Sequence, residues 1–369
     1  MRQVVPKFAL VVVSVLVALA LLEGLSWVTP QSLLPARLRE VRDRLDLYRR
    51  AEGMFVTDSE LLFKIRPNTD IIVSHPDYRV RVRTHLNLDG IGFRGGSLGG
   101  PAWGAAVGDS FTFGVGVEHE ETWVARLAQA LGREIVNLAI PAQGPPQYTR
   151  VLKRYALPLR PRVVFYGFYF NDLDAANRFY RMKRTLVPVS RYLRQYSVLY
   201  NLLSESRTSA LTDEPAPAGG DRVGLTTDSE EPVIDAAALQ RTLERQNRNF
   251  EQRWRVTMKE LDDAVKASRD AQVELVMLYL PSRWEVYWES IKAQSRLPES
   301  LDIDRRRRAV VEYCGARKIP CFDLTPALKR ETAQGKPLYF RTDGHWNREG
   351  NRVVSEALKK FLTEKGLAG

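Results

Sequence analysis

Cysteine and histidine are scarce: the 369 residues include two cysteines and four histidines. So few cysteines exclude both a scaffold held together by disulfide bonds and a cysteine-rich zinc site. The histidines lack the spacing of a metal site, so neither a metal nor another cofactor is expected. The chain also lacks zinc-finger spacing, a ribonucleoprotein motif and a recognition-helix pattern, which argues against nucleic acid as a partner.

Acidic residues are outnumbered by basic ones, and the formal net charge is +11 at pH 7. Such an excess suits anionic lipid headgroups or an acidic polysaccharide, or it is simply a solvated surface. The densest basic run, residues 305–308, lies in a segment with a helical pattern, so only some of its arginines can share a face. With 44% hydrophobic and 27% charged residues, the composition is that of a globular protein and excludes a multi-span membrane protein.

The most apolar stretch lies at the start of the chain. Residues 8–22 carry no charge, and apolar side chains continue beyond Glu23 as far as residue 28. This is close to the ~20 residues that span the hydrocarbon core of a bilayer. With Arg2 and Lys7 before it, the segment 1–29 is predicted to form a transmembrane helix whose cationic end stays inside.

A cleaved signal peptide is the alternative, with its cleavage site at residues 18–20. Either interpretation places residues 30–369 outside the cytoplasm, in the periplasm or at the cell surface. In that compartment Cys314 and Cys321, seven residues apart, are predicted to form a local disulfide across a helix-to-strand turn. The alternative is a pair of small, buried apolar side chains.

From about residue 80 onward, buried strand patterns alternate with helical patterns. Strands are predicted at residues 105–107, 134–141, 162–172, 273–281 and 321–328. Helices are predicted at residues 122–132, 146–161, 309–319 and 350–366. This alternation predicts an α/β fold with a parallel sheet that is covered on both faces.

The remaining segments flank or interrupt this domain, which is assigned to residues 80–369. Residues 30–79 read as a charged stalk helix followed by a strand-rich lead-in that ends in a basic hairpin. An insertion at 173–260 interrupts the alternation. Within it, residues 204–232 are rich in Ser, Thr, Pro, Gly and Asp and predict a flexible loop. A helix at 236–267 is predicted to pack on the rim of the domain.

Three predicted strands deliver unusual residues at their carboxyl ends, where open α/β sheets bind ligands. Ser110 follows the first strand between two glycines, where its hydroxyl can be exposed at a helix N-terminus. Thr112 excludes the G-x-S-x-G motif. The small residues 137–144 follow the second strand and let backbone N–H groups approach a substrate. Asn171 follows the third and can hold a carbonyl oxygen, or simply cap a turn.

A histidine with a neighbouring carboxylate completes the set. Asp343 and His345 share a tight turn with Gly344, just before the last helix. The carboxylate can accept from one imidazole nitrogen, which leaves the other free to take a proton from a serine. None of His75, His85 and His119 combines a neighbouring carboxylate with a glycine in so tight a turn. The sequence therefore predicts a serine nucleophile activated by His345.

This combination resembles the SGNH/GDSL hydrolase superfamily over roughly residues 80–369. The resemblance implies a flavodoxin-like three-layer α/β/α sandwich. It also implies that Ser110 is the nucleophile, His345 the general base and then acid, and Asp343 the carboxylate that orients it. An oxyanion hole would combine the N–H of Ser110, a backbone N–H from Ala142 or Gly144, and the side chain of Asn171.

Three departures from the superfamily pattern are visible. Tyr169 replaces the usual glycine two residues before the asparagine, and Ala142 stands where the second-block glycine falls. Asp343 lies two residues before the histidine instead of three. That spacing, the Trp346–Asn347 continuation and the segment 280–283 are similar to the branch that acts in O-acetylation of exported polysaccharides such as alginate.

The resemblance leaves three functions open. The first is hydrolysis of an ester, above all an O-acetyl group on an exported glycan. The second is transfer of the acyl group to a glycan, which differs only in whether water or a sugar hydroxyl attacks the acyl-enzyme. The third is a non-catalytic glycan-binding or assembly subunit of a polysaccharide synthesis or export machinery. The intact set of Ser110, Asp343 and His345 argues against the third.

Overall fold

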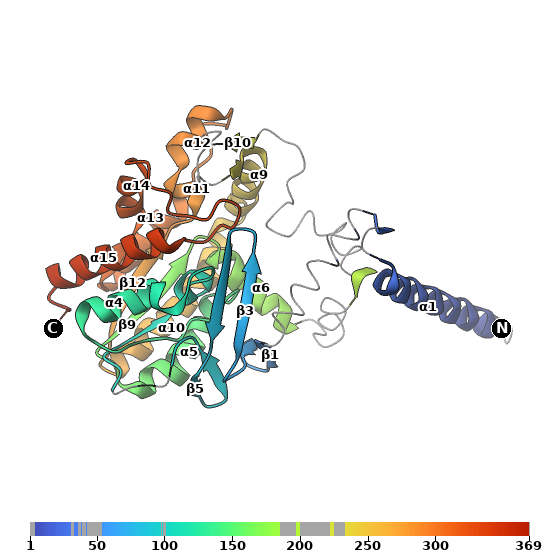
Figure 1. Ribbon diagram of the computed structural model, residues 1–369, viewed down its shortest axis with the longest axis horizontal. Coiled ribbons are helices and arrows are strands. Elements are labelled where there is room, and N and C mark those ends of the chain that lie inside the picture. Colours follow the sequence, from blue (N-terminus) through green and yellow to red (C-terminus); the bar gives the residue numbers. More distant parts are fainter. Residues whose placement is uncertain are drawn as a thin grey trace. The chain divides into compact units, whose positions relative to one another are not determined.

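The chain folds as two compact units, residues 1–53 with 182–216 and residues 54–181 with 217–369. The structure is a computed structural model (Figure 1) that describes residues 4–30, 33–35, 38, 42, 54–96, 98, 101–184, 197–199, 222–224 and 233–368. The predicted loop 204–232 lies outside the described residues, except for β10 (Arg222–Gly224), which pairs antiparallel with β11 (Val233–Asp235). The predicted stalk helix after residue 30 lies almost wholly outside them.

The smaller unit contains helix α1, Val4–Val28, which accounts for the apolar start of the chain. Glu23, within this helix, accepts hydrogen bonds from the indole of Trp27 at 2.9 Å, the hydroxyl of Ser197 at 2.8 Å and the N–H of Val198 at 2.7 Å. The expected transmembrane helix is not supported: within the part of the chain that the structure describes, no helix is both long and apolar enough to cross a bilayer.

The larger unit is built on one sheet of five parallel strands. The strands are β7 (Gly104–Val107), β8 (Ile135–Asn137), β9 (Val163–Tyr169), β12 (Glu274–Leu280) and β13 (Cys321–Asp323). Their order is β13-β12-β9-β7-β8, and all four pairings are parallel. Numbered along the chain this is the 2-1-3-4-5 order of flavodoxin-like sheets, so the predicted parallel α/β sandwich is confirmed.

Helices cover both faces of the sheet, because alternate residues of each strand point to opposite sides. Ala105 and Val107 of β7 join one apolar core and Ala106 joins the other. The first core contains residues of α5 (Pro145–Val151), α10 (Phe250–Asp270) and α13 (Arg305–Arg317). The second contains residues of α4 (Trp123–Leu131), α9 (Ala236–Asn247), α11 (Arg283–Val286), α12 (Trp288–Gln294), α14 (Thr325–Thr332) and α15 (Arg348–Glu364).

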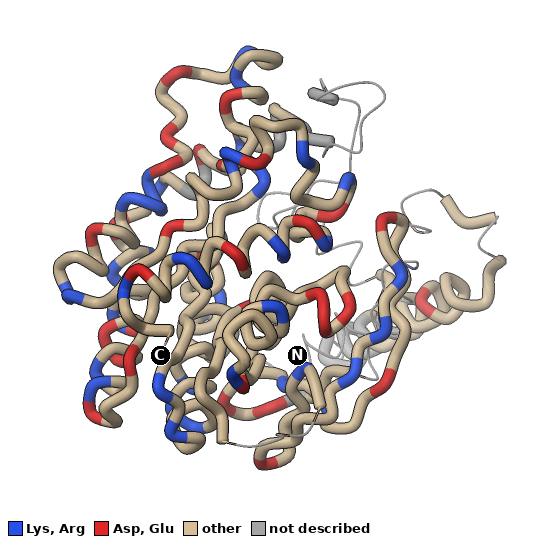
Figure 2. Tube along the Cα trace, turned by 60° about the vertical axis from the view of Figure 1, so that its left-hand side comes forward, with Lys and Arg blue, Asp and Glu red and all other residues tan. Residues whose placement is uncertain are grey.

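Three antiparallel hairpins precede the sheet. They pair β1 (Phe55–Asp58) with β2 (Leu62–Ile65), β3 (Asp70–His75) with β4 (Tyr78–Arg83), and β5 (Leu86–Leu88) with β6 (Ile91–Phe93). In β4, Val80 and Val82 are buried in the first core, whereas the alternating arginines are exposed. Along the helices of this unit, Lys and Arg positions are interspersed with Asp and Glu (Figure 2).

The predicted rim helix at 236–267 is wrong in its extent and its place. Asn249 adopts a left-handed conformation, φ 60°, and divides the segment into α9 and α10. Leu239 and Leu243 of α9 are buried in the second core, and Leu261 of α10 is buried in the first. The two helices therefore belong to opposite layers of the sandwich, and α10 leads directly into strand β12.

The predicted disulfide is also wrong, because Cys314 and Cys321 are free thiols. The chain turns between α13 and β13 through Lys318, whose φ is 52°. This turn brings the two sulfur atoms into hydrogen-bonding contact. That contact, together with burial, raises the pKa of the Cys314 thiol.

Candidate active site

The carboxyl end of β7 turns abruptly into the four-residue helix α3, Ser110–Phe113. A Cβ atom on Gly108 would lie 2.3 Å from the hydroxyl oxygen of Thr112, so only glycine fits beneath this helix. Asp109 caps the helix, because its carboxylate accepts the N–H of Phe111 at 2.9 Å. Ser110 is therefore the first helical residue, held at the end of a buried strand.

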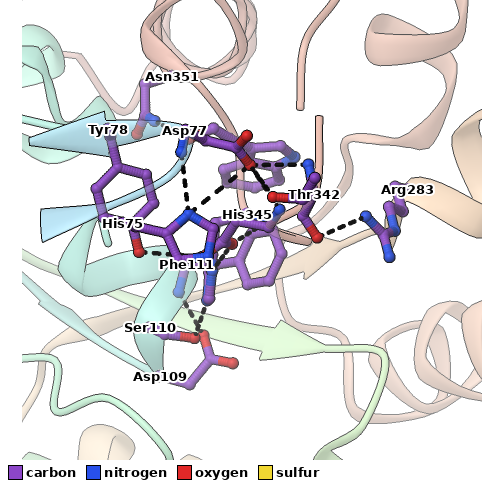
Figure 3. Close-up of polar contacts among 12 residues, drawn as sticks. His75, Asp77, Tyr78, Asp109, Ser110, Phe111, Arg283, Thr342, His345 and Asn351 are labelled. Atoms are coloured by element: carbon purple, nitrogen blue, oxygen red, sulfur yellow. Dashed lines mark hydrogen bonds and ion pairs between the residues drawn. The ribbon is translucent and has the colours of Figure 1, made fainter. Parts of the chain in front are cut away.

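The turn before α15 brings the predicted base to this serine (Figure 3). Nε2 of His345 lies 2.7 Å from Oγ of Ser110. Nδ1 of His345 is hydrogen-bonded to Oδ1 of Asp343, and the same oxygen accepts the backbone N–H of His345 at 2.8 Å. The ring of Phe111 packs against the imidazole with centroids 4.9 Å apart. The three residues thus have the connectivity of a serine-histidine-carboxylate triad.

The electrostatic environment suits an ionised orienting carboxylate. Burial raises the pKa of Asp343, but attraction to His345 and its hydrogen bonds outweigh this and hold the pKa well below the usual range. The carboxylate remains an acceptor at neutral pH, which fixes the imidazole tautomer with its proton on Nδ1. Nε2 is then free to accept a proton from Ser110.

Two further carboxylates lie buried behind the nucleophile. Burial raises the pKa of Asp109 to about 6, and it raises the pKa of Asp172 well above the usual range. Their mutual repulsion raises the pKa of Asp172 further. The carboxylate of Asp172 accepts the hydroxyl of Tyr148 and the N–H of Tyr169, each at 2.9 Å. These contacts join α5, the end of β9 and the start of α6 beneath the site.

The structure distinguishes between the two predicted backbone donors. The N–H of Gly144 already donates to the side chain of Gln147 at 3.3 Å. Gly144 is also a packing residue, because a Cβ there would lie 2.5 Å from Cβ of Ala175. Ala142 has φ 62° and is exposed, and no hydrogen bond to another described residue occupies its N–H. Ala142 is therefore the better candidate for an oxyanion donor.

Ala142 thus adopts the left-handed conformation that glycine favours. The structure therefore accommodates alanine here with some backbone strain.

Asn171 follows β9 and begins α6 (Asp172–Arg184), and its carbonyl accepts the N–H of Ala175 at 3.1 Å. Its side chain is exposed. β7 and β9 are neighbours at the point where the strand order reverses, and ligands bind at such points in this class of fold. Ser110 and Asn171 therefore flank the expected ligand crevice. The role of Asn171 as an oxyanion donor stays a prediction.

Sequence reasoning missed three residues that support the site. Asp77 and Tyr78, in the hairpin formed by β3 and β4, contact the turn that contains Asp343. Arg94 is buried and donates to the carbonyls of Phe113 and Gly114 at the end of α3. The only available signals were a Ser-His-Pro-Asp turn and an arginine between glycine-rich segments, and neither indicates a partner.

Among the residues that the structure describes, no group of three or more His, Cys, Asp or Glu side chains is arranged to hold a metal ion.

One family model covers the part of the chain that contains Asp343 and His345. Residues 239–369 match the family model of the SGNH hydrolase-like domain of the acetyltransferase AlgX. No curated protein matches the chain.

Several solved structures align with this chain at low TM-scores. One is a lipolytic protein of the G-D-S-L family from Desulfitobacterium hafniense, with 15% identity, TM-score 0.38, and 70% of this chain and 98% of that chain covered. Another is a catalytic mutant of the acetylxylan esterase Axe2 from Geobacillus stearothermophilus, with 12% identity, TM-score 0.37, and 72% and 95% covered. A third is the enzyme LAE5 from the metagenome of Lake Arreo, with 14% identity, TM-score 0.40, and 72% and 95% covered.

The sheet has the flavodoxin-like strand order, and a serine, a histidine and a carboxylate are joined by hydrogen bonds at its carboxyl edge. The carboxy-terminal part of the chain, residues 239–369, resembles the SGNH hydrolase-like domain of the acetyltransferase AlgX, and this part supplies Asp343 and His345 to the site.

Proposed function

We propose that this protein removes O-acyl groups, chiefly acetyl, from an exported polysaccharide through a covalent acyl-serine intermediate. The observation that carries the proposal is the 2.7 Å contact between Oγ of Ser110 and Nε2 of His345, with Asp343 on the other imidazole nitrogen. The match to an acetyltransferase domain supports acetyl as the acyl group.

The geometry supports a two-step reaction. Oγ of Ser110 attacks the ester carbonyl while Nε2 of His345 takes the hydroxyl proton. The carbonyl oxygen becomes negative and is stabilised by the N–H groups of Ser110 and Ala142 and by the side chain of Asn171. When the tetrahedral intermediate collapses, His345 returns the proton to the leaving alcohol and the acyl group stays on Ser110. A water molecule, deprotonated by His345, then releases the carboxylic acid.

Transfer is the second candidate, because the matched family model is that of an acetyltransferase. In this case a sugar hydroxyl replaces water in the second step, and His345 takes the proton of that hydroxyl. Incubating the enzyme with an acetyl donor and a deacetylated oligosaccharide separates the two. Free acetate alone indicates hydrolysis, and an acetylated oligosaccharide indicates transfer.

The acyl-enzyme chemistry is tested by Ser110→Ala. This variant should lose on the order of 10³-fold or more in kcat/KM on p-nitrophenyl acetate, because the triad acts as a unit. Intact mass spectrometry after treatment with a serine-reactive phosphonate should show one adduct on the wild type and none on the variant. Ser74→Ala, at an exposed serine of β3, is the control and should behave as wild type. A Ser110→Ala protein with wild-type activity would contradict the acyl-serine mechanism.

We also propose that residues 30–369 act outside the cytoplasm, where they would meet an exported glycan and its synthesis or export machinery. The support is the uncharged run at residues 8–22 and the basic residues before it. Fusing residues 1–29 to alkaline phosphatase, which is active only after export, tests this directly. An inactive fusion in bacterial cells would contradict export.

A further inference from the structure

The hairpin of β3 and β4 touches the turn that presents the triad carboxylate. Oδ2 of Asp77 accepts three hydrogen bonds from this turn, from the N–H of Thr342 at 2.7 Å, from its hydroxyl at 2.8 Å and from the N–H of Asp343 at 2.8 Å. These bonds lower the pKa of Asp77 although burial raises it, so the carboxylate is charged at neutral pH. One anionic side chain therefore fixes the backbone on which Asp343 is mounted.

The next residue of the hairpin, Tyr78, contacts the carboxylate of Asp343 itself. The hydroxyl of Tyr78 donates to Oδ2 of Asp343 at 3.0 Å. Oδ1 of the same carboxylate is occupied by His345. Because each oxygen has its own donor, the carboxylate cannot rotate about its Cβ–Cγ bond without breaking a hydrogen bond.

Tyr78 is itself held by its neighbours. Its ring stacks on His75, with centroids 4.9 Å apart and planes 20° from parallel. On another side it contacts Phe340, also at 4.9 Å. A Cβ on Gly116, whose φ is 85°, would lie 2.4 Å from the ring of Phe340 and 3.0 Å from that of Tyr78, so the loop after α3 approaches both rings closely. The phenol is thus packed into one position.

The turn needs this support. Residues 341–345 belong to no helix or strand. Gly344, between the carboxylate and the base, has open space where a Cβ would be. A glycine in such a turn leaves the backbone many conformations. The hydrogen bonds of Asp343 and His345 require a single conformation of this turn.

We propose that the Asp77–Tyr78 corner of the hairpin positions the triad, with Tyr78 as a positioning residue that acts through Asp343. This inference rests on the proposed acyl-serine chemistry. The inference adds the hairpin of β3 and β4 to the active site, although this hairpin precedes β7 in the chain and lies outside the five-stranded sheet.

The test is Tyr78→Phe, which removes only the hydroxyl. We expect kcat on p-nitrophenyl acetate to fall about 10- to 100-fold, as for loss of a hydrogen bond to a charged group, with KM changed less than about 2-fold. Tyr313→Phe is the matched control. It removes a tyrosine–carboxylate hydrogen bond of 2.8 Å, from Tyr313 to Asp262, that does not involve the triad, and it should leave kcat unchanged.

A double-mutant cycle separates positioning from general damage. In an Asp343→Ala background, Tyr78→Phe should change the rate of phosphonate labelling of Ser110 by less than about 2-fold, because the acceptor of its hydroxyl is gone. The same loss in both backgrounds overturns the inference, as does a wild-type kcat for Tyr78→Phe. If Tyr78→Phe fails to fold by circular dichroism, Thr342→Val replaces it. That variant removes one bond to Asp77, and a wild-type kcat there overturns the inference.

The two proposals fail differently. Wild-type activity in Ser110→Ala removes the acyl-serine chemistry and this inference with it. An inactive Ser110→Ala beside a fully active Tyr78→Phe removes only the positioning role.

Discussion

Asn171 shows how far a single residue can be understood from its place in the fold. It lies at the carboxyl end of β9, beside the strand that delivers Ser110, and its side chain is exposed. An amide there can donate to an oxyanion without changing the net charge of the site. The structure gives its position, and its chemical role needs a kinetic measurement.

Asn171→Ala should lower kcat by roughly 10²- to 10³-fold if the amide stabilises the oxyanion, with little change in KM. Steady-state kinetics on p-nitrophenyl acetate measure this. Asn177→Ala is the control on the same helix, because the Asn177 amide donates to the carbonyl of Leu173 within that helix. Equal kinetics for the two variants would exclude Asn171 from the oxyanion hole.

The residues that meet around Ser110 were predictable to different degrees. Asp343 and His345 could be found because they are close in sequence and lie in one glycine-containing turn. Ser110 and Asn171 could be found because both follow buried strands, and parallel strands end at one edge. Tyr78 could not, because it lies 265 residues from Asp343 and belongs to a hairpin whose pattern encodes only its own pairing.

At the scale of elements, Arg94 links a hairpin to the nucleophile helix. It follows β6, is 1% exposed, and donates to the carbonyls of Phe113, Gly114 and Val117. Burial lowers the pKa of Arg94 to about 10, which still leaves it charged at neutral pH. The loop that leaves α3 therefore takes its hydrogen bonds from an element outside the sheet.

Arg94→Met should destabilise the protein by about 3–5 kcal/mol, because three buried carbonyls lose their donor while the apolar volume is largely kept. Urea unfolding followed by circular dichroism gives the value. Arg83→Ala, at an exposed position of β4, should stay within about 0.5 kcal/mol of wild type. A similarly small effect for Arg94→Met would show that the loop after α3 does not depend on the hydrogen bonds of Arg94 for its stability.

The same scale explains why some elements were predicted wrongly. Apolar periodicity identified the helix at 236–267, but it carries no signal for the left-handed Asn249 that divides it between two layers. The separation of Cys314 and Cys321 permits a disulfide, yet it does not specify the side-chain geometry at the turn between α13 and β13. Pattern and spacing predict elements well, and they predict how elements pack much less well.

At the scale of the whole molecule, Asp109 makes stability depend on pH. Burial raises its pKa to about 6, above the ordinary value of 3.8, so the folded state binds a proton more tightly than the unfolded state. As the pH rises from about 4 to 6, this carboxyl ionises readily in the unfolded state but unfavourably in the buried site. The free energy of unfolding therefore decreases over this pH range.

Asp109→Asn removes this titration while keeping an oxygen that can accept the N–H of Phe111. Relative to wild type, the variant should gain stability as the pH rises from 4 to 7, by about 3 kcal/mol at most, since one pKa unit is worth about 1.4 kcal/mol. Thermal unfolding of both proteins across this pH range measures the difference. A stability difference that stays constant from pH 4 to 7 would contradict the assignment.

The hydrogen bond between Tyr78 and Asp343 joins an early and a late part of the chain, so it can form only near the end of synthesis. A ribosome completes the hairpins, β7 and Ser110 long before it reaches His345. Until then the serine has no base, and the corner that will hold Asp343 has nothing to hold. In the proposed mechanism, Ser110 of the nascent chain therefore has no base, and its acylation can begin only after residues 343–345 have been made and have packed against the earlier segments.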